Sequence, residues 1–202
     1  MLRTRIGSLE LASPLLTASG TFGHDLAALE FLEAGDLGAL VLKTVTPRPR
    51  PGNPPPRLVE TPAGLLNSIG LENRGLDAFL EKTVPLLEAA PVPVIANAGG
   101  ESPAEFEAMA AAFEGVSAVA GVELNLSCPN VQGGRLPFAT SPEAVAEVVR
   151  GCRRRLQKPL WAKLSPNVTR IAPLAQAAEK AGADALTVAN TLLGLVVDWR
   201  AR

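Results

Sequence analysis

Cysteine, histidine and aromatic residues are scarce in this sequence of 202 residues, which has two cysteines, one histidine and no tyrosine. Two cysteines cannot build a disulfide framework, and there is no CxxC pair or histidine cluster with the spacing of a metal site. We therefore expect Cys128 and Cys152 to be free thiols, and we expect no bound metal.

Long hydrophobic runs and an excess of one charge are also absent. No apolar stretch approaches the roughly 18 residues that cross a bilayer, and the first residues lack the pattern of a signal peptide. The formal net charge is −1, with acidic and basic residues interspersed, so no strong electrostatic field attracts a nucleic acid. These absences predict a soluble, cytoplasmic protein that binds neither membranes nor nucleic acids.

Apolar residues make up 47% of the chain, which is ample for one core. Six short apolar runs alternate with amphipathic segments, and they lie at residues 14–20, 37–44, 92–100, 121–128, 159–166 and 184–191. Ser102 and Ser141, each followed by proline, are typical helix N-caps. Strands and helices that alternate in this way predict a parallel sheet with helices outside it.

Polar residues at the ends of the predicted strands favour a closed barrel over an open sheet. In a barrel the carboxyl ends of the strands meet at one mouth, where the chemistry of such enzymes is found. An open sheet more often has a Gly-rich phosphate loop after its first strand, and "ASGTFG" matches GxGxxG poorly. We therefore predict a (β/α)8 TIM barrel truncated after its sixth strand, as a single domain over residues 1–202 that is incomplete at the C-terminus. The long connection 45–90 is typical of a lid or binding loop.

Cys128 is the first candidate for chemistry, because it follows a predicted strand in the loop "NLSCPN". A free cysteine is often a small buried hydrophobic residue. At a strand end it can instead face a pocket and act as a general base or acid. A nucleophilic role calls for a histidine partner, and the one histidine, His24, lies in a predicted helix start. Cys152, in "VVRGCRRRL", is predicted to pack a helix.

Lysines and asparagines at the other strand ends complete the candidate site. Lys43 and Lys163 follow the apolar runs "GALVL" and "PLWA", where a charge is costly unless an anion meets it. An asparagine taken singly can cap a helix or a turn, but four of them occur with these lysines and the thiol, namely Asn67, Asn97, Asn125 and Asn190. The set predicts a site for a flat, hydrogen-bonding ring.

Five motifs of the sequence resemble those of the dihydroorotate dehydrogenase family, in family order and across the whole chain: "VLKTVTPRPRPGNPPPR", "LNSIGLENRG", "NLSCPN", "KLSP" and "ANTLLG". Details such as "NSIGLENRG", "NVQGG" and "NTLLG" are similar to the class 1B catalytic subunit. The resemblance implies an FMN-containing barrel that oxidises dihydroorotate to orotate in pyrimidine (UMP) biosynthesis. It also implies that Cys128 is the base that takes the C5 proton while hydride passes from C6 to flavin N5.

The resemblance also implies the remaining site residues. Positions matching FMN contacts are Ser19, Lys43, Thr44, Asn97, Asn125, Lys163 and Ala189, with Lys163 stabilising the anionic reduced flavin. Positions matching substrate contacts are Lys43, Asn67, Ser68, Ile69, Gly70, Leu71, Asn125, Asn190 and Thr191. The glycine-rich loops that hold the FMN phosphate in the family have no counterpart in the sequence.

The resemblance to class 1B further implies a partner subunit that carries FAD and an iron–sulfur cluster and passes electrons to NAD, in a heterotetramer built on a homodimer of this chain. Two cysteines are too few to ligate a cluster, which normally takes four thiolates. A flavin-dependent tRNA dihydrouridine synthase is the alternative enzyme, although it should show a basic face for phosphates. An inactive truncated barrel fragment is the alternative outside enzymes.

Overall fold

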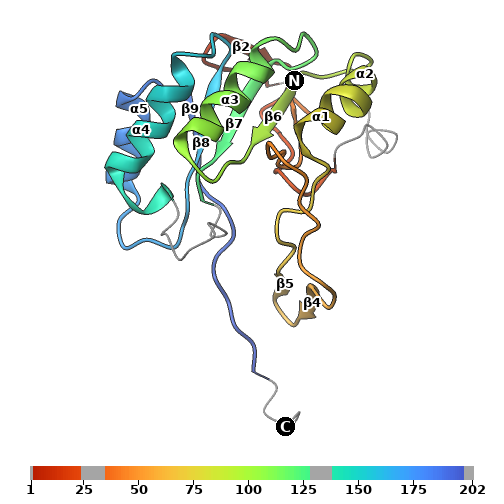
Figure 1. The fold of residues 1–202 in the computed structure, drawn as a ribbon, viewed down its shortest axis with the longest axis vertical. Coiled ribbons are helices and arrows are strands. Elements are labelled where there is room, and N and C mark those ends of the chain that lie inside the picture. Colours follow the sequence, from red (N-terminus) through yellow and green to blue (C-terminus); the bar gives the residue numbers. More distant parts are fainter. Residues whose placement is uncertain (1, 24–34, 128–137, 198–202) are drawn as a thin grey trace.

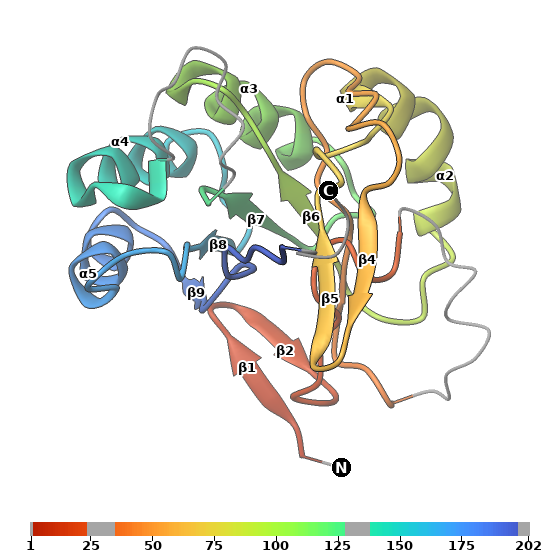
Figure 2. The same ribbon diagram turned by 90° about the horizontal axis from the view of Figure 1, so that it is seen from below.

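A computed structural model describes residues 2–23, 35–127 and 138–197 of the chain. Its centre is a curled, five-stranded parallel sheet with the strand order β3-β6-β7-β8-β9 (Figures 1 and 2). The strands are β3 (Leu40–Val41), β6 (Val94–Ala98), β7 (Gly121–Asn125), β8 (Leu160–Lys163) and β9 (Ala185–Thr187). The predicted parallel sheet is therefore confirmed.

Three helices cover the outer face of this sheet, namely α3 (Pro103–Glu114), α4 (Pro142–Arg153) and α5 (Ala172–Lys180) (Figure 2). The predicted caps are confirmed, because Ser102 Oγ accepts from Glu105 N at 3.2 Å and Ser141 Oγ accepts from Ala144 N at 3.3 Å. A short 3₁₀ turn, η3 (Phe138–Thr140), precedes α4. Gly182 follows α5 with φ +108°, a conformation that only glycine adopts without strain.

Two antiparallel hairpins lie outside the sheet. The first pairs β1 (Thr4–Ile6) with β2 (Leu9–Leu11), and the second pairs β4 (Leu58–Thr61) with β5 (Gly64–Asn67). The β4–β5 hairpin projects from the side on which the parallel strands end (Figure 1). A helical stretch follows it, made of α1 (Gly75–Ala78), the π turn η2 (Phe79–Thr83) and α2 (Val84–Leu87). The long connection 45–90 therefore holds a structured arm and one helical stretch.

The sequence analysis predicts a strand at residues 14–20. This prediction is wrong, because the segment does not form a regular strand in the structure. Leu16 forms an isolated parallel bridge to Ala39, next to β3. The Thr17 hydroxyl then donates to Val41 O at 3.1 Å and accepts from Val41 N at 2.8 Å. Gly38 N still donates to Leu15 O at 2.7 Å and Thr17 N to Ala39 O at 3.4 Å, and the Thr17 hydroxyl takes the place of the backbone only at Val41. The segment therefore runs beside β3 without becoming a regular strand.

The main hydrophobic core lies between the sheet and the three helices. It includes the outward side chains of the parallel strands together with the large apolar residues of α3, among them Phe106 and Phe113. The rings of Phe79 and Phe113 meet edge to face, with centroids 5.6 Å apart. Among the residues that the structure describes, no helix is both long and apolar enough to cross a membrane.

Cys152 lies in this core on α4 and is fully buried, which confirms that it packs a helix. Burial, with the nearby Glu107 carboxylate as a second cause, raises the pKa of this thiol to about 12. An unfolded cysteine ionises near about pH 8.5. The protonated Cys152 thiol therefore makes its full contribution to the free energy of unfolding below that pH. This contribution is lost as the pH rises toward the folded pKa.

We predict that the free energy of unfolding falls between about pH 8.5 and about pH 10.5, by at most about 1.4 kcal/mol per pH unit from this thiol. This free energy is measured by denaturant unfolding of the protein and of the Cys152→Ala variant at each pH. The variant lacks the thiol, so the difference in free energy of unfolding between the protein and the variant should shrink as the pH rises. A difference that stays constant would contradict the prediction.

Candidate active site

The face of the sheet opposite the helices carries an apolar layer and a polar layer. The apolar layer includes Val41, Ile95 and Trp161, packed against Leu11 of the first hairpin. Side chains two positions apart on a strand point to the same face. The residues two positions beyond these three are Lys43, Asn97 and Lys163. The polar layer therefore lies on the concave face, toward the carboxyl ends of the strands.

Asn125, at the end of β7, is the centre of a buried hydrogen-bonded cluster. Its Nδ2 donates to Thr44 Oγ1 at 3.1 Å, and its Oδ1 accepts from Ser127 Oγ at 3.0 Å and from Asn190 Nδ2 at 3.2 Å. The hydroxyl of Ser19 lies 3.5 Å from Thr44 Oγ1. The cluster thus brings together four predicted site residues from separate parts of the chain, Ser19, Thr44, Asn125 and Asn190. Ser127 joins them.

Glu123 is a residue that the sequence analysis missed. It is 2% exposed, and its carboxylate accepts from Asn97 Nδ2 at 2.5 Å and from Thr187 Oγ1. The nitrogen of the Asn97 amide therefore faces Glu123. Asn97 Oδ1 is buried and has no hydrogen-bond partner among the described residues. The available signal was an acidic residue inside the apolar strand "GVELN".

Lys163 brings a cation into the polar layer. Its side chain belongs to a residue only 6% exposed, and in the described part of the chain no hydrogen bond or ion pair involves its Nζ. The register places Lys163 beside Asn125 on β7 and beside Thr187 on β9. A cation on so little exposed a side chain is costly without an anion nearby, so this position favours an anionic ligand.

The predicted substrate residues Asn67 to Leu71 lie on the arm, at and after the end of β5. Asn53 holds this segment, since its Nδ2 donates to Ser68 O at 2.8 Å and its backbone N donates to Ile69 O at 3.0 Å. Within the described residues, no hydrogen bond joins the segment to the Asn125 cluster. The structure thus keeps these two groups of predicted contacts on separate elements.

The remaining predicted residues lie near the strand ends, except for those that the structure does not describe. Ala189 is half-buried after β9, and the exposed Thr191 donates its backbone N–H to Asn190 Oδ1 at 2.8 Å. Lys43 is half-buried after β3. Cys128 and His24 lie outside the described residues. Within those residues, there is no group of three or more His, Cys, Asp or Glu side chains that could hold a metal.

Comparison with known proteins places the chain in a family. The profile described as "Dihydroorotate dehydrogenase" matches residues 1–202. The chain belongs to the dihydroorotate dehydrogenase family. It is 49% identical over 197 residues to a protein of Trichlorobacter lovleyi and 46% identical over 197 residues to one of Pelobacter propionicus, both named "Dihydroorotate dehydrogenase B (NAD(+)), catalytic subunit". These matches cover 98% of this chain and 65% of each relative.

A solved dihydroorotate dehydrogenase of Eimeria tenella, in complex with ferulenol, has a similar fold. Its TM-score is 0.77 at 21% identity, and the match covers 96% of this chain and 61% of that one. The predicted fold class is therefore confirmed, with the curled sheet forming part of a (β/α)8 barrel. The predicted resemblance to the class 1B catalytic subunits is also confirmed by the named relatives.

Membership of the dihydroorotate dehydrogenase family implies a flavin cofactor, and the polar layer fits one. A flavin ring presents hydrogen-bond donors and acceptors along one edge and gains negative charge on reduction. Asn97 Oδ1 and Lys163 Nζ, which have no partner in the part of the chain that the structure describes, offer one acceptor and one cation on the same concave face. The Asn125 cluster adds amide and hydroxyl groups beside them.

Proposed function

We propose that the protein, an oxidoreductase, converts dihydroorotate to orotate in pyrimidine biosynthesis with FMN as its flavin. The observation that carries the proposal is the Asn125 cluster, in which side chains from four parts of the chain meet at the strand ends beside Lys163. Neutral amides and hydroxyls of this kind can orient a polar ring without competing for its protons. Family membership gives the substrate class.

The reaction removes a proton from C5 of dihydroorotate and a hydride from C6. We assign the C5 proton to the Cys128 thiolate, a general base of the kind that a strand-end loop can present. FMN, when bound, supplies the acceptor for the hydride. Lys163 provides positive charge on the concave face, where a preorganised cation stabilises developing negative charge.

The contacts proposed for this reaction are of two kinds, to the cofactor and to the substrate. The proposed FMN contacts are Ser19, Lys43, Thr44, Asn97, Asn125, Lys163 and Ala189. The proposed substrate contacts are Lys43, Asn67, Ser68, Ile69, Gly70, Leu71, Asn125, Asn190 and Thr191. Lys43 and Asn125 belong to both sets.

An anaerobic reduction experiment tests the proposed function. The FMN-loaded protein is mixed with dihydroorotate, and bleaching of the flavin absorbance is followed. Bleaching with formation of orotate is expected, while a tRNA that contains dihydrouridine should leave the flavin oxidised. Absence of any reduction by dihydroorotate would overturn the proposal. Reduction by the tRNA alone would instead favour the dihydrouridine synthase, which the family match does not support.

A partner subunit with FAD and an iron–sulfur cluster is the further part of this proposal, with two copies of this chain in a heterotetramer. Support comes from the names of the relatives, which specify a catalytic subunit and NAD. The sequence itself has two cysteines and no GxGxxG fingerprint. We therefore expect electrons to leave this protein through another chain.

We predict that the FMN-loaded protein alone reduces artificial acceptors with dihydroorotate but reduces NAD barely, and that adding the partner subunit restores NAD reduction. Formation of NADH is measured at 340 nm with and without the partner, and dye reduction serves as the control for an active protein. Efficient NAD reduction by the isolated protein would contradict the need for a partner.

A further inference from the structure

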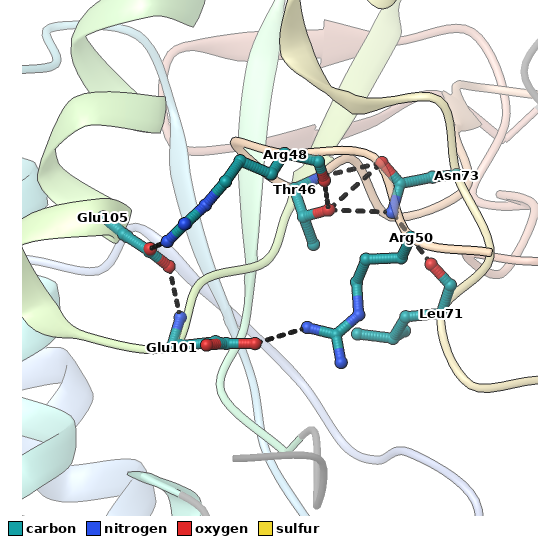
Figure 3. A network of polar contacts seen from close by, with 7 residues as sticks. All are labelled: Thr46, Arg48, Arg50, Leu71, Asn73, Glu101 and Glu105. Atoms are coloured by element: carbon teal, nitrogen blue, oxygen red, sulfur yellow. Dashed lines mark hydrogen bonds and ion pairs between the residues drawn. The ribbon is translucent and has the colours of Figure 1, made fainter. Parts of the chain in front are cut away.

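We propose that Asn73 is a positioning residue that fixes the segment Asn67–Leu71 against the strand end that carries Lys43 and Thr44. The inference rests on the proposed function, since both groups are proposed substrate or cofactor contacts. Asn73 itself lies in neither group. It is 6% exposed and sits between them, in the network drawn in Figure 3.

The side chain of Asn73 uses all of its hydrogen-bonding groups. Its Oδ1 accepts from Thr46 N at 3.2 Å and from Gly75 N at 2.9 Å. Its Nδ2 donates to Thr46 Oγ1 and to Leu71 O, both at 2.8 Å. Thr46 follows Thr44 by two residues, so one amide group joins the end of β3 to the end of the segment Asn67–Leu71.

Proton accounting fixes the orientation of this amide. A threonine hydroxyl has one proton, and Thr46 Oγ1 lies 2.7 Å from Arg48 O, which can only accept it. The hydroxyl also lies 3.2 Å from Asn73 Oδ1, but Thr46 N and Gly75 N can only donate and both reach Oδ1. The oxygen of the amide therefore faces these backbone groups, and its nitrogen faces Thr46 Oγ1. The second amide hydrogen is directed to Leu71 O. An oxygen in place of Nδ2 would lose both donated bonds.

Leu71 is the residue that needs this support. Its φ is +54°, the only positive φ at a non-glycine residue in the described part of the chain, and it follows Gly70 at φ +75°. A left-handed conformation at a leucine costs about 1–2 kcal/mol. The bond from Asn73 Nδ2 to Leu71 O helps to hold that conformation, and with it the direction of the segment Asn67–Leu71.

The other end of the network is also anchored. Arg50 and Asn73 exchange two backbone hydrogen bonds, of 2.9 Å and 3.0 Å. The Arg50 side chain pairs with Glu101 at 2.7 Å, and Arg48 pairs with Glu105 at 3.2 Å, near the start of α3 (Figure 3). Asn73 therefore connects the segment Asn67–Leu71 to the parallel sheet and to helix α3.

Asn73→Asp is the discriminating variant, because it keeps acceptors for Thr46 N and Gly75 N but removes the donor to Leu71 O. We expect the dissociation constant for orotate and the KM for dihydroorotate to rise about tenfold or more. The flavin content should stay unchanged, and kcat should change less than about threefold. Thr46→Val removes the hydroxyl that accepts from Asn73 Nδ2. It should raise the dissociation constant for orotate and the KM for dihydroorotate severalfold.

Glu114→Ala is the matched control, because it removes the hydrogen bonds that Glu114 Oε2 accepts from Gln157 N at 3.0 Å and from Lys158 N at 3.3 Å, at the opposite end of α3 from the Arg48 and Arg50 ion pairs. It should lower thermal stability while leaving orotate binding unchanged. Orotate binding is measured by titration of the flavin spectrum of the FMN-loaded protein. Unchanged orotate affinity in both Asn73→Asp and Thr46→Val would overturn the inference, as would an equal loss in Glu114→Ala. If the unaltered protein binds no orotate, the proposed function itself fails.

Discussion

Replacing Cys128 with alanine is expected to slow flavin reduction by dihydroorotate at least about 10²-fold, the usual scale for the loss of a positioned general base. The proton at C5 then has no acceptor in the site, while binding of the substrate ring by the amides remains. The rate is measured by anaerobic stopped-flow absorbance at saturating dihydroorotate. Orotate should still perturb the flavin spectrum of the variant, because binding does not need the thiol.

Cys152→Ala is the control for this experiment, since Cys152 is the other cysteine and lies buried in the helical core. It should reduce stability but leave the rate of flavin reduction unchanged. Cys128→Ser should recover activity only at raised pH, because a hydroxyl ionises far less readily than a thiol. A near-normal rate in Cys128→Ala would exclude the thiol as the base.

The second large effect is expected at Lys163, a residue only 6% exposed whose Nζ forms no hydrogen bond or ion pair with the described residues. Lys163→Met should shift the flavin midpoint potential to more negative values, because a cation favours the anionic reduced form by Coulomb attraction. A shift of at least about 30 mV is expected, which for a two-electron couple is about 1.4 kcal/mol. The potential is measured by reductive titration against a reference dye.

Lys180→Met is the matched control, because it removes the same charge from an exposed position at the end of α5. Solvent screens that charge, so the potential should not move. If Lys163→Met and Lys180→Met both leave the potential unchanged, Lys163 does not act on the flavin. Equal shifts in the two variants would indicate a general charge effect rather than a local one.

Local sequence patterns were sufficient to predict the parallel sheet and its outer helices. Apolar runs of strand length, separated by amphipathic segments with Ser-Pro starts, specify buried strands and capped helices without reference to the rest of the chain. The N-caps Ser102 and Ser141 were therefore found where expected. The polar residues at strand ends were likewise readable, because a parallel sheet brings its carboxyl ends to one edge.

Patterns that depend on distant partners were misjudged or missed. The segment 14–20 looks like a strand, but the Thr17 hydroxyl takes the place of the ladder at Val41. The β4–β5 hairpin is hidden in a proline-rich arm whose composition resembles that of an irregular loop. Glu123 looks like a lone charge until Asn97 and Thr187 are placed beside it.

The sequence by itself determined the fold class, the family and the residue types of the candidate site, since each of these depends on local periodicity or on contiguous motifs. The tertiary structure alone decided which of those residues meet. Asn125 contacts Thr44 and Asn190, which lie 81 and 65 residues away along the chain. Asn73 reaches Thr46, 27 residues away. Such pairs are set by strand register and loop path, which arise only when the whole sheet has formed.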